Sequence, residues 1–366
     1  MKRMSRLILF ELEKIVKRKI VWVGLAVLLL LNVALYMTVG MPSMTVMSDD
    51  GGYIRGADAI AADKQIAAEY EGVVTDSVVD RLLSDHRVKQ EKTEIYAYMD
   101  YAYDNLGRYF MDENGRYSGL PVTAVFGEDP QMREFHYGRG GEDLLTYLPL
   151  IFLVMGYVLI IALTPVFSDE YARRTDALIL TSRLGKRQCA LSKAAASLLF
   201  SAVLALAVIA VNYVLVAAFY GTEGWNMSIQ LCGAGDYTAV PYVMTLGETL
   251  IWAVVFFLSA MIGLTGLILI CSAFSSSSFV ALIVVLVIYT VPLFLTQLAY
   301  EPLQYALSFM PIIMTTVVQV LAKPLLELGS LSVNFACLPV LTMLLLAASS
   351  FFLCVKAFRR TAEVRG

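Results

Sequence analysis

Residues Leu144–Phe167 read LLTYLPLIFLVMGYVLIIALTPVF and contain no charged side chain. The hydrocarbon core of a bilayer is about 30 Å thick and a helix rises about 1.5 Å per residue, so about 20 apolar residues cross it. A segment surrounded by lipid must also satisfy its own backbone hydrogen bonds, as a helix does. The stretch therefore predicts a membrane-spanning helix.

Five other blocks have the same length and character: Ile20–Gly40, Ala194–Tyr220, Gly247–Cys271, Phe279–Leu298 and Asn334–Val355. The chain is 58% hydrophobic and 16% charged, whereas soluble domains have roughly 45–50% apolar and about 25% charged residues. This composition excludes a single soluble domain and a disordered chain. We predict an all-α membrane protein with six spanning helices, the first of them kept as a helix rather than cleaved as a signal peptide.

Lysine and arginine gather in three places: the N-terminal segment, the loop after the second span and the C-terminal tail. The loops Gly221–Leu246 and Ala299–Val333 contain almost none. Cytoplasmic loops of membrane proteins carry the excess of these residues. We therefore expect both termini and the loop 168–193 on the cytoplasmic side, and the long segment Met41–Asp143 outside.

The stretch Leu303–Ala322 is apolar enough to pass as a seventh span. A seventh span would place the basic tail outside, and Pro311 interrupts the stretch. We instead expect a re-entrant or interfacial helical hairpin within residues 299–333 on the outer side. The expected domains are 1–40 (interfacial helix and first span), 41–143 (ectodomain) and 144–366 (the remaining spans).

The segment Met41–Asp143 is acidic and has the patterning of a folded, mainly helical ectodomain. Helices are predicted at Ala57–Glu71 and Asp76–Phe110. Tyrosines cluster near the end of the second helix, at positions Tyr96, Tyr98, Tyr101, Tyr103 and Tyr109. They either form a binding patch for a peptide, sugar or partner, or pack as amphipathic side chains near the membrane surface.

Motifs for chemistry are missing from the chain. The sequence has no GxxxxGK[ST] phosphate loop, no HExxH pair and no GxSxG elbow. Its five cysteines lack the paired spacing of a zinc site or disulfide framework. We expect no catalysis, no metal and no cofactor bound by this chain, and nothing indicates nucleic-acid binding.

Residues Met4–Lys19 predict an amphipathic helix in the headgroup layer, with its apolar face buried and its cations near anionic lipid. Phe10 and Glu11 fall on the wrong faces of that helix. The alternative is a basic flank that merely orients the first span.

The loop after the second span reads SDEYARRTDALILTSRLGKRQCALSK over Ser168–Lys193. Its apolar run Ala177–Leu180 is too short to cross a bilayer. The pattern fits a short helix on the cytoplasmic surface with arginines facing water or a partner. A solvated basic loop that only sets topology fits equally well.

With the interfacial helix and the outer hairpin, this loop resembles the permeases of ABC-2 type transporters. The matching places are Glu170, Arg173-Arg174, Ala177–Leu180, Ser182-Arg183 and Lys193. The chain departs from that pattern by lacking Gly-Thr after the first basic residues and Pro before Ser-Arg. The resemblance covers the membrane portion and not the ectodomain.

The resemblance implies a permease in a bacterial plasma membrane that exports a substrate and pairs with a second permease copy or a homologue. ATP and magnesium would be bound by a separate cytoplasmic ATPase. The loop would dock on that ATPase through Glu170, Arg173, Arg174, Asp176, Leu178, Arg183, Lys186 and Arg187.

Polar residues within or beside the spans are candidates for a transport pathway or for helix packing: Asn32, Asn212, Gln297 and Asn334. The substrate stays open. One alternative function is a membrane sensor or scaffold whose ectodomain binds an external ligand. A membrane-embedded enzyme is disfavoured because no paired catalytic residues share one membrane depth.

Overall fold

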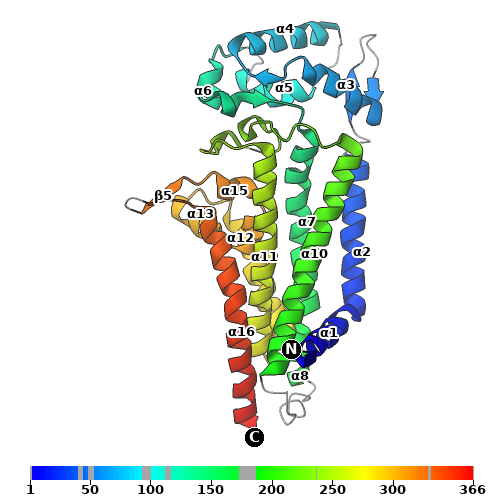
Figure 1. Ribbon diagram of the computed structural model, residues 1–366, viewed down its shortest axis with the longest axis vertical. Coiled ribbons are helices and arrows are strands. Elements are labelled where there is room, and N and C mark those ends of the chain that lie inside the picture. The colour runs from blue at the N-terminus through cyan, green and yellow to red at the C-terminus, as the bar shows by residue number, and fades with distance from the viewer. Residues whose placement is uncertain are drawn as a thin grey trace.

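The computed structural model describes residues 2–39, 44–47, 53–92, 100–111, 117–172, 187–235, 237–328 and 331–365. A long helical bundle carries a separate helical layer, the ectodomain, at one end (Figure 1). Both chain termini lie towards the opposite end of the bundle.

Within these described residues, six helices are long and apolar enough to cross a membrane, which confirms the predicted number. They are α2 (Lys19–Ala34), α7 with α8 (Arg139–Leu163 and Pro165–Ala172), α10 (Gln188–Tyr220), α11 (Leu246–Phe274), α12 (Ser278–Leu295) and α16 (Cys337–Arg365). A short π-helix, Leu35–Val39, extends α2.

Helix α7 begins at Arg139, five residues before the predicted start of the second span. Its first five residues include Arg139, Glu142 and Asp143, which the sequence placed in the ectodomain. Hydropathy marks the lipid-facing length of a helix, whereas this helix continues into the ectodomain, where protein groups contact its polar side chains. The expected domain boundary at 143 therefore falls inside a helix.

The predicted amphipathic helix is present as α1 (Lys2–Val16). Ile15 is buried, and Ile8 and Leu12 pack against the core. Leu9 and Phe10 are exposed. The helix packs against α10, so α1 contacts the bundle as well as any surrounding lipid.

Helix α11 is the centre of the bundle and packs against α7, α10, α12 and α16. Gly263 and Gly266 face α16, where a Cβ at Gly266 would lie 2.8 Å from the Cα of Ala347. The Ser201 hydroxyl of α10 donates to the carbonyl of Met261. Small residues let helices approach closely, and the contacts described here join helices of the same chain.

The segment after α12 forms three short helices, α13 (Glu301–Leu307), α14 (Pro311–Met314) and α15 (Val317–Leu321). Proline suits the first position of a helix, and Pro311 occupies that place in α14. None of the three is a candidate span. An antiparallel hairpin of β5 (Leu325–Leu328) and β6 (Leu331–Asn334) follows, which the sequence did not predict.

In its described part, the ectodomain contains two longer helices and several short elements. The strand pair β1 (Thr45–Met47) and β2 (Tyr53–Arg55) precedes α3 (Ala57–Ala68), and β3 (Gly72–Val73) pairs with β4 (Glu134–Phe135). The remaining elements are α4 (Asp76–Lys92), α5 (Tyr101–Asn105), the 3-10 helices Gly107–Phe110 and Pro130–Arg133, and α6 (Val122–Phe126). Two more 3-10 turns, Ile229–Leu231 and Tyr237–Ala239, lie between α10 and α11.

The prediction of one helix over Asp76–Phe110 was wrong. Helix α4 ends at Lys92, and Asp100 begins a new helix by accepting a hydrogen bond from the backbone of Tyr103. An N-cap aspartate starts a helix because it satisfies one of the unpaired first-turn amides. The tyrosines do not form one surface patch, since Tyr101 is fully buried against Phe135, while Tyr96 and Tyr98 lie outside the described residues.

Substitution of the two α11 glycines tests the close contact with α16. We expect Gly266→Ala to lower the thermal midpoint clearly, because its Cβ would meet the backbone of Ala347, which cannot rotate away. Gly263→Ala should lower it too, because its Cβ would meet the Cβ of Met343, which is also fixed by the backbone. Thermal unfolding of both purified variants in detergent measures the two shifts, and midpoints equal to that of the wild-type protein would contradict the helix contact described.

Candidate functional site

The predicted docking residues begin at the end of α8 and finish at the start of α10, and these two helix ends form the base of the loop. Helix α8 ends at Ala172 and α10 begins at Gln188. Glu170 and Arg187 lie within these described flanks, and Arg187 is exposed beside the first turn of α10. The other predicted docking residues, Arg173, Arg174, Asp176, Leu178, Arg183 and Lys186, lie outside the described residues.

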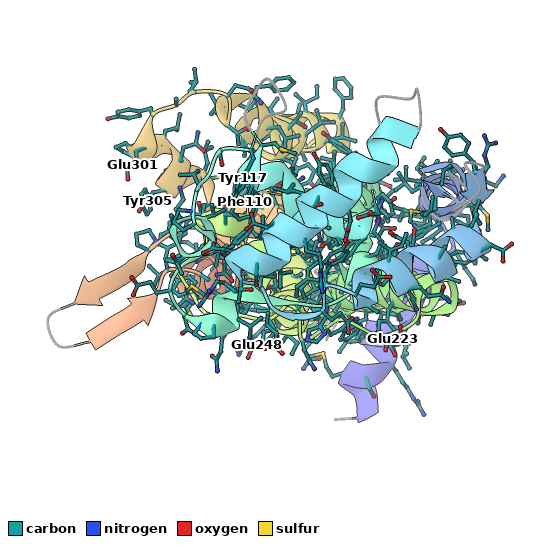
Figure 2. The ribbon with its side chains drawn as sticks, turned by 90° about the horizontal axis from the view of Figure 1, so that it is seen from above. Phe110, Tyr117, Glu223, Glu248, Glu301 and Tyr305 are labelled. Atoms are coloured by element: carbon teal, nitrogen blue, oxygen red, sulfur yellow. The ribbon has the colours of Figure 1, made fainter. Side chains whose placement is uncertain are left out.

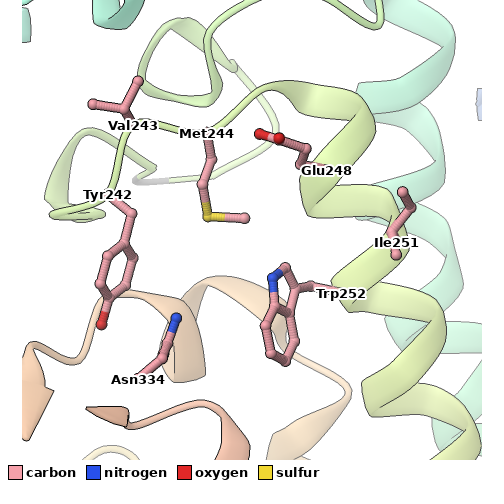
Figure 3. A pocket seen from close by; sticks show the side chains of 7 residues that line it. All are labelled: Tyr242, Val243, Met244, Glu248, Ile251, Trp252 and Asn334. Atoms are coloured by element: carbon pink, nitrogen blue, oxygen red, sulfur yellow. The ribbon is translucent and has the colours of Figure 1, made fainter. Parts of the chain in front are cut away.

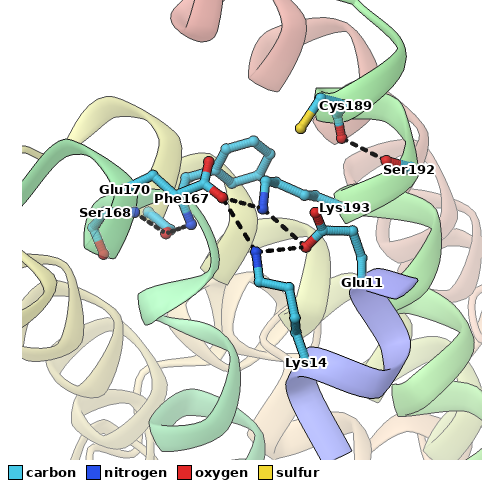
Figure 4. Close-up of polar contacts among 9 residues, drawn as sticks. Glu11, Lys14, Phe167, Ser168, Glu170, Cys189, Ser192 and Lys193 are labelled. Carbon is cyan, nitrogen blue, oxygen red and sulfur yellow. Dashed lines mark hydrogen bonds and ion pairs between the residues drawn. The ribbon is translucent and has the colours of Figure 1, made fainter. Parts of the chain in front are cut away.

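Four charged side chains meet at this base: Glu11, Lys14, Glu170 and Lys193, here called the loop-base cluster (Figure 4). The Lys193 Nζ lies 2.6 Å from Glu170 Oε1 and 2.9 Å from Glu11 Oε2. The Lys14 Nζ lies 3.4 Å from the same two oxygens. Two acids and two lysines thus form a charge-balanced group.

The cluster joins three segments that are distant in sequence. Glu11 and Lys14 come from α1, Glu170 from α8 and Lys193 from the second turn of α10. Lys193 is 1% exposed, and both carboxylate residues are also buried. Removing one member of a buried ion pair leaves an uncompensated charge, at a cost of about 3–5 kcal/mol. The segments on either side of the loop are therefore held to each other and to α1.

Sequence reasoning missed most of this cluster. In the sequence, Glu11 is an acid that interrupts the apolar face of the amphipathic helix. The structure gives the reason for its position. Its side chain turns towards α10 to pair with Lys193. Lys193 was a family-like position at the opening of the third span, without a role. An acid on the buried side of an amphipathic helix was the available signal.

Hydrogen bonds to the backbone hold the turn between α7 and α8 in place. The Ser272 hydroxyl of α11 accepts hydrogen bonds from the backbone amides of Phe167 and Ser168 and donates to the carbonyl of Thr164. The Ser168 and Ser278 hydroxyls lie 2.9 Å apart, which connects the turn to the start of α12. These bonds satisfy the amides freed where Pro165 begins α8.

The structure describes all four candidate pathway residues, and no hydrogen bond joins one of them to another. Asn32 and Asn212 are buried, and each donates to a carbonyl one turn earlier in its own helix, of Leu28 and Val208 respectively. Gln297 is exposed beyond the end of α12. Asn334 lies at the ectodomain side of the bundle and lines a pocket there. A pathway role for these residues stays a prediction.

A second polar arrangement joins the ectodomain to the bundle. Glu142, in the first turn of α7, is buried, and its Oε1 accepts hydrogen bonds from the Tyr101 hydroxyl at 2.8 Å, the Asn105 amide at 2.5 Å and the Gly233 backbone at 3.1 Å. The Tyr101 hydroxyl also accepts from the Gly138 amide. One carboxylate thus holds the ectodomain helix α5 and the loop after α10 against α7.

The ectodomain side of this joint contains a buried aspartate. Asp63 of α3 is 1% exposed and accepts a hydrogen bond from the Tyr101 backbone. Burial raises the pKa of Asp63 to about 6, and it also raises the pKa of Asp104. Desolvation disfavours the charged form of a carboxyl group, so these acids bind protons more tightly in the folded chain.

Within the described ranges, no three histidine, cysteine or acidic side chains lie close enough to hold a metal ion. The charged groups of the loop-base cluster and of the joint around Glu142 contact other protein groups. Both arrangements therefore hold separate helices at fixed positions.

Two neighbouring glutamates of α1 provide a test of the loop-base cluster. Glu11→Gln should lower the free energy of unfolding by about 2 kcal/mol, less than the loss of a sole partner, because Lys193 keeps its pair with Glu170. Glu13→Gln is the matched control, since Glu13 and its partner Lys17 are exposed, and exposed pairs contribute about 0.5 kcal/mol or less. Denaturant unfolding in detergent measures both, and equal effects would contradict a buried cluster.

Asp63 gives a pH prediction. Between its ordinary pKa near 4 and about 6, the folded chain binds more protons than the unfolded one, so unfolding releases protons and lowering the pH stabilises the fold. We expect the thermal midpoint to rise as the pH falls from 7 to 5, and Asp63→Asn to remove part of that rise. A slope unchanged in Asp63→Asn would mean that this carboxyl does not titrate there.

Comparison with known proteins identifies the family of this chain. A family model described as "ABC-2 family transporter protein" matches residues 7–352. No curated protein and no solved structure matches the chain significantly. The family match includes α1 from Leu7 onwards, the loop-base cluster and all but the end of the last span. The chain therefore belongs to the ABC-2 family of transporter proteins.

Proposed function

We propose that this chain is an exporting permease driven by a separate cytoplasmic ATPase, which docks on residues 168–193. Membership of the family and six candidate spans make the chain a multi-pass membrane permease of the ABC transporter class. The ATPase, the direction of transport and the docking segment belong to the proposal.

The loop-base cluster is the observation that carries the proposal. A partner that pushes or pulls on a loop moves the spans only if the loop's ends are firmly attached to them. Glu170 at the end of α8 and Lys193 at the start of α10 are joined by a buried ion pair, and both are tied to α1. A force on the loop would therefore act on α1, α8 and α10 together rather than unfold their ends.

The arrangement of the ends supports a cytoplasmic position for the loop. The termini, the end of α8 and the start of α10 lie towards the same end of the bundle, away from the ectodomain (Figure 1). The two termini and the loop between α8 and α10 are rich in lysine and arginine. The side with the basic segments faces the cytoplasm in most membrane proteins, so this end would meet the ATPase.

A second permease copy completes the proposal. ATPases of this class act in pairs, and two chains with one docking segment each would present one segment to each ATPase. Export is proposed from the family resemblance, and the substrate is left open.

Charge reversal in the loop tests the docking role. Arg173→Glu, Arg174→Glu and Arg187→Glu together should release the ATPase, because a surface that attracts acidic groups becomes one that repels them. Co-purification with the tagged permease, followed by mass spectrometry and ATPase activity, measures the loss. The permease itself should still reach the membrane.

Reversal of Arg359, Arg360 and Arg365 in the C-terminal tail is the control, because it changes the same number of charges on the same side. We expect this variant to retain the ATPase. Equal retention by both variants would argue against docking at the loop. A wild-type complex that contains no ATPase would instead favour a sensor or scaffold.

A further inference from the structure

A pocket of about 320 Å³ lies at the ectodomain end of the bundle (Figure 3). It is formed where the first two turns of α11 meet the segment before that helix and the end of β6. Its lining residues are Tyr242, Val243, Met244, Glu248, Ile251, Trp252 and Asn334. The volume is at the lower end of the range of small-molecule sites, roughly 300–1,000 Å³.

The pocket has one acidic group. Glu248 closes a capping box with Thr245, where its Oε2 accepts a hydrogen bond from the Thr245 backbone at 2.9 Å. The carboxylate is exposed, and it forms no ion pair within the described part of the chain. The capping box fixes the position of this negative charge at the mouth of the pocket.

Two hydrogen-bond donors face the same space. Asn334 accepts from the Ala336 backbone with Oδ1, which leaves its Nδ2 as a donor. The indole nitrogen of Trp252 and this amide nitrogen both point into the pocket in Figure 3, and neither has an acceptor among the residues that the structure describes. Donors and an acid at fixed positions fit a ligand that has both an acceptor oxygen and a cation.

The apolar wall of the pocket is held in place. The Tyr242 hydroxyl donates to the carbonyl of Lys323 at 2.7 Å, and the Tyr242 carbonyl accepts from the Gln230 side chain at 2.7 Å. Met244 is buried beside it. The pocket is therefore pre-formed, which lowers the entropic cost of binding.

The pocket opens beside the exposed face of a candidate span. Ile251 is 67% exposed on α11, a candidate span. Tryptophan and tyrosine are also enriched at the membrane interface. The occupant that fits is therefore an amphiphile, whose chains lie along α11 while its polar group enters the pocket.

We propose that this pocket binds the headgroup of a zwitterionic aminophospholipid. The ammonium group pairs with Glu248, and the phosphate accepts hydrogen bonds from Trp252 and Asn334. This site is separate from the loop-base cluster at the other end of the bundle, and it does not depend on the proposed ATPase. Loss of lipid binding and loss of ATPase docking are thus distinguishable results.

Fluorescence of Trp252 tests the proposal directly. The chain has three tryptophans, so Trp22→Phe with Trp225→Phe leaves Trp252 as the only one. The protein is placed in phosphatidylglycerol vesicles, and phosphatidylethanolamine brominated near the glycerol end of its acyl chains is added. Quenching should saturate at about a tenfold lower mole fraction than with brominated phosphatidylglycerol.

Substitutions in the full-length protein complete the test. Glu248→Gln keeps the capping box, because glutamine also serves there, and it should abolish the preference between the two lipids. Asn334→Asp keeps the acceptor for Ala336 and should repel the phosphate. Glu301→Gln is the control, since Glu301 is exposed at the same end but apart from Glu248 (Figure 2).

If the double tryptophan variant folds poorly, native mass spectrometry of the wild-type protein measures the same lipid preference, because it counts each lipid that is bound. Equal quenching by both lipids, or an unchanged preference in Glu248→Gln, would overturn the proposal. An equal loss in Glu301→Gln would overturn it too, because it would indicate general surface charge. Displacement by free phosphoethanolamine at similar concentration would overturn the assignment to a lipid.

Discussion

A lysine with almost no exposed surface must have negative partners, and this requirement shapes the end of the bundle that carries the termini. Lys193 has two, Glu11 and Glu170, at 2.9 and 2.6 Å. They come from α1 and α8, so neither helix can leave α10 without exposing a buried charge. The basic loop between α8 and α10 consequently starts and ends on one fixed base, and α1 belongs to that base rather than lying free on the membrane.

Helices α7 and α8 together reach both ends of the molecule. Glu142 in the first turn of α7 holds the ectodomain through Tyr101 and Asn105, and Glu170 in α8 belongs to the loop-base cluster. Between them, Ser272 ties the α7–α8 turn to α11. Two charged joints on one continuous element give a physical route by which movement at the loop would reach the ectodomain. This route requires that α7 and α8 move as one body.

Length and absence of charge were sufficient to predict the six spans, because the bilayer dictates both. The start of α7 was missed since Arg139, Glu142 and Asp143 are polar, yet they lie in a helix that ends in protein rather than in water. Glu11 and Lys193 are 182 residues apart, and periodicity describes only neighbours in sequence. The break at Asp100 was equally hidden, because a helical pattern ran through it. The β5–β6 hairpin was missed although Gly329-Ser330, a dipeptide typical of hairpin turns, stands between its two strands in the sequence.

The rigidity of the loop base is most directly measured as a distance between α1 and α10. Spin labels at Glu13 and Gln188, both exposed and outside the cluster, would report it by pulsed electron resonance in the assembled transporter, with and without trapped ATP. If the loop-base cluster holds these helices together, one narrow distance persists in both states while the spans rearrange. A shift of about one helix turn, roughly 5 Å, or a broad distribution, would show that the cluster opens and that the loop does not move the three helices as a unit.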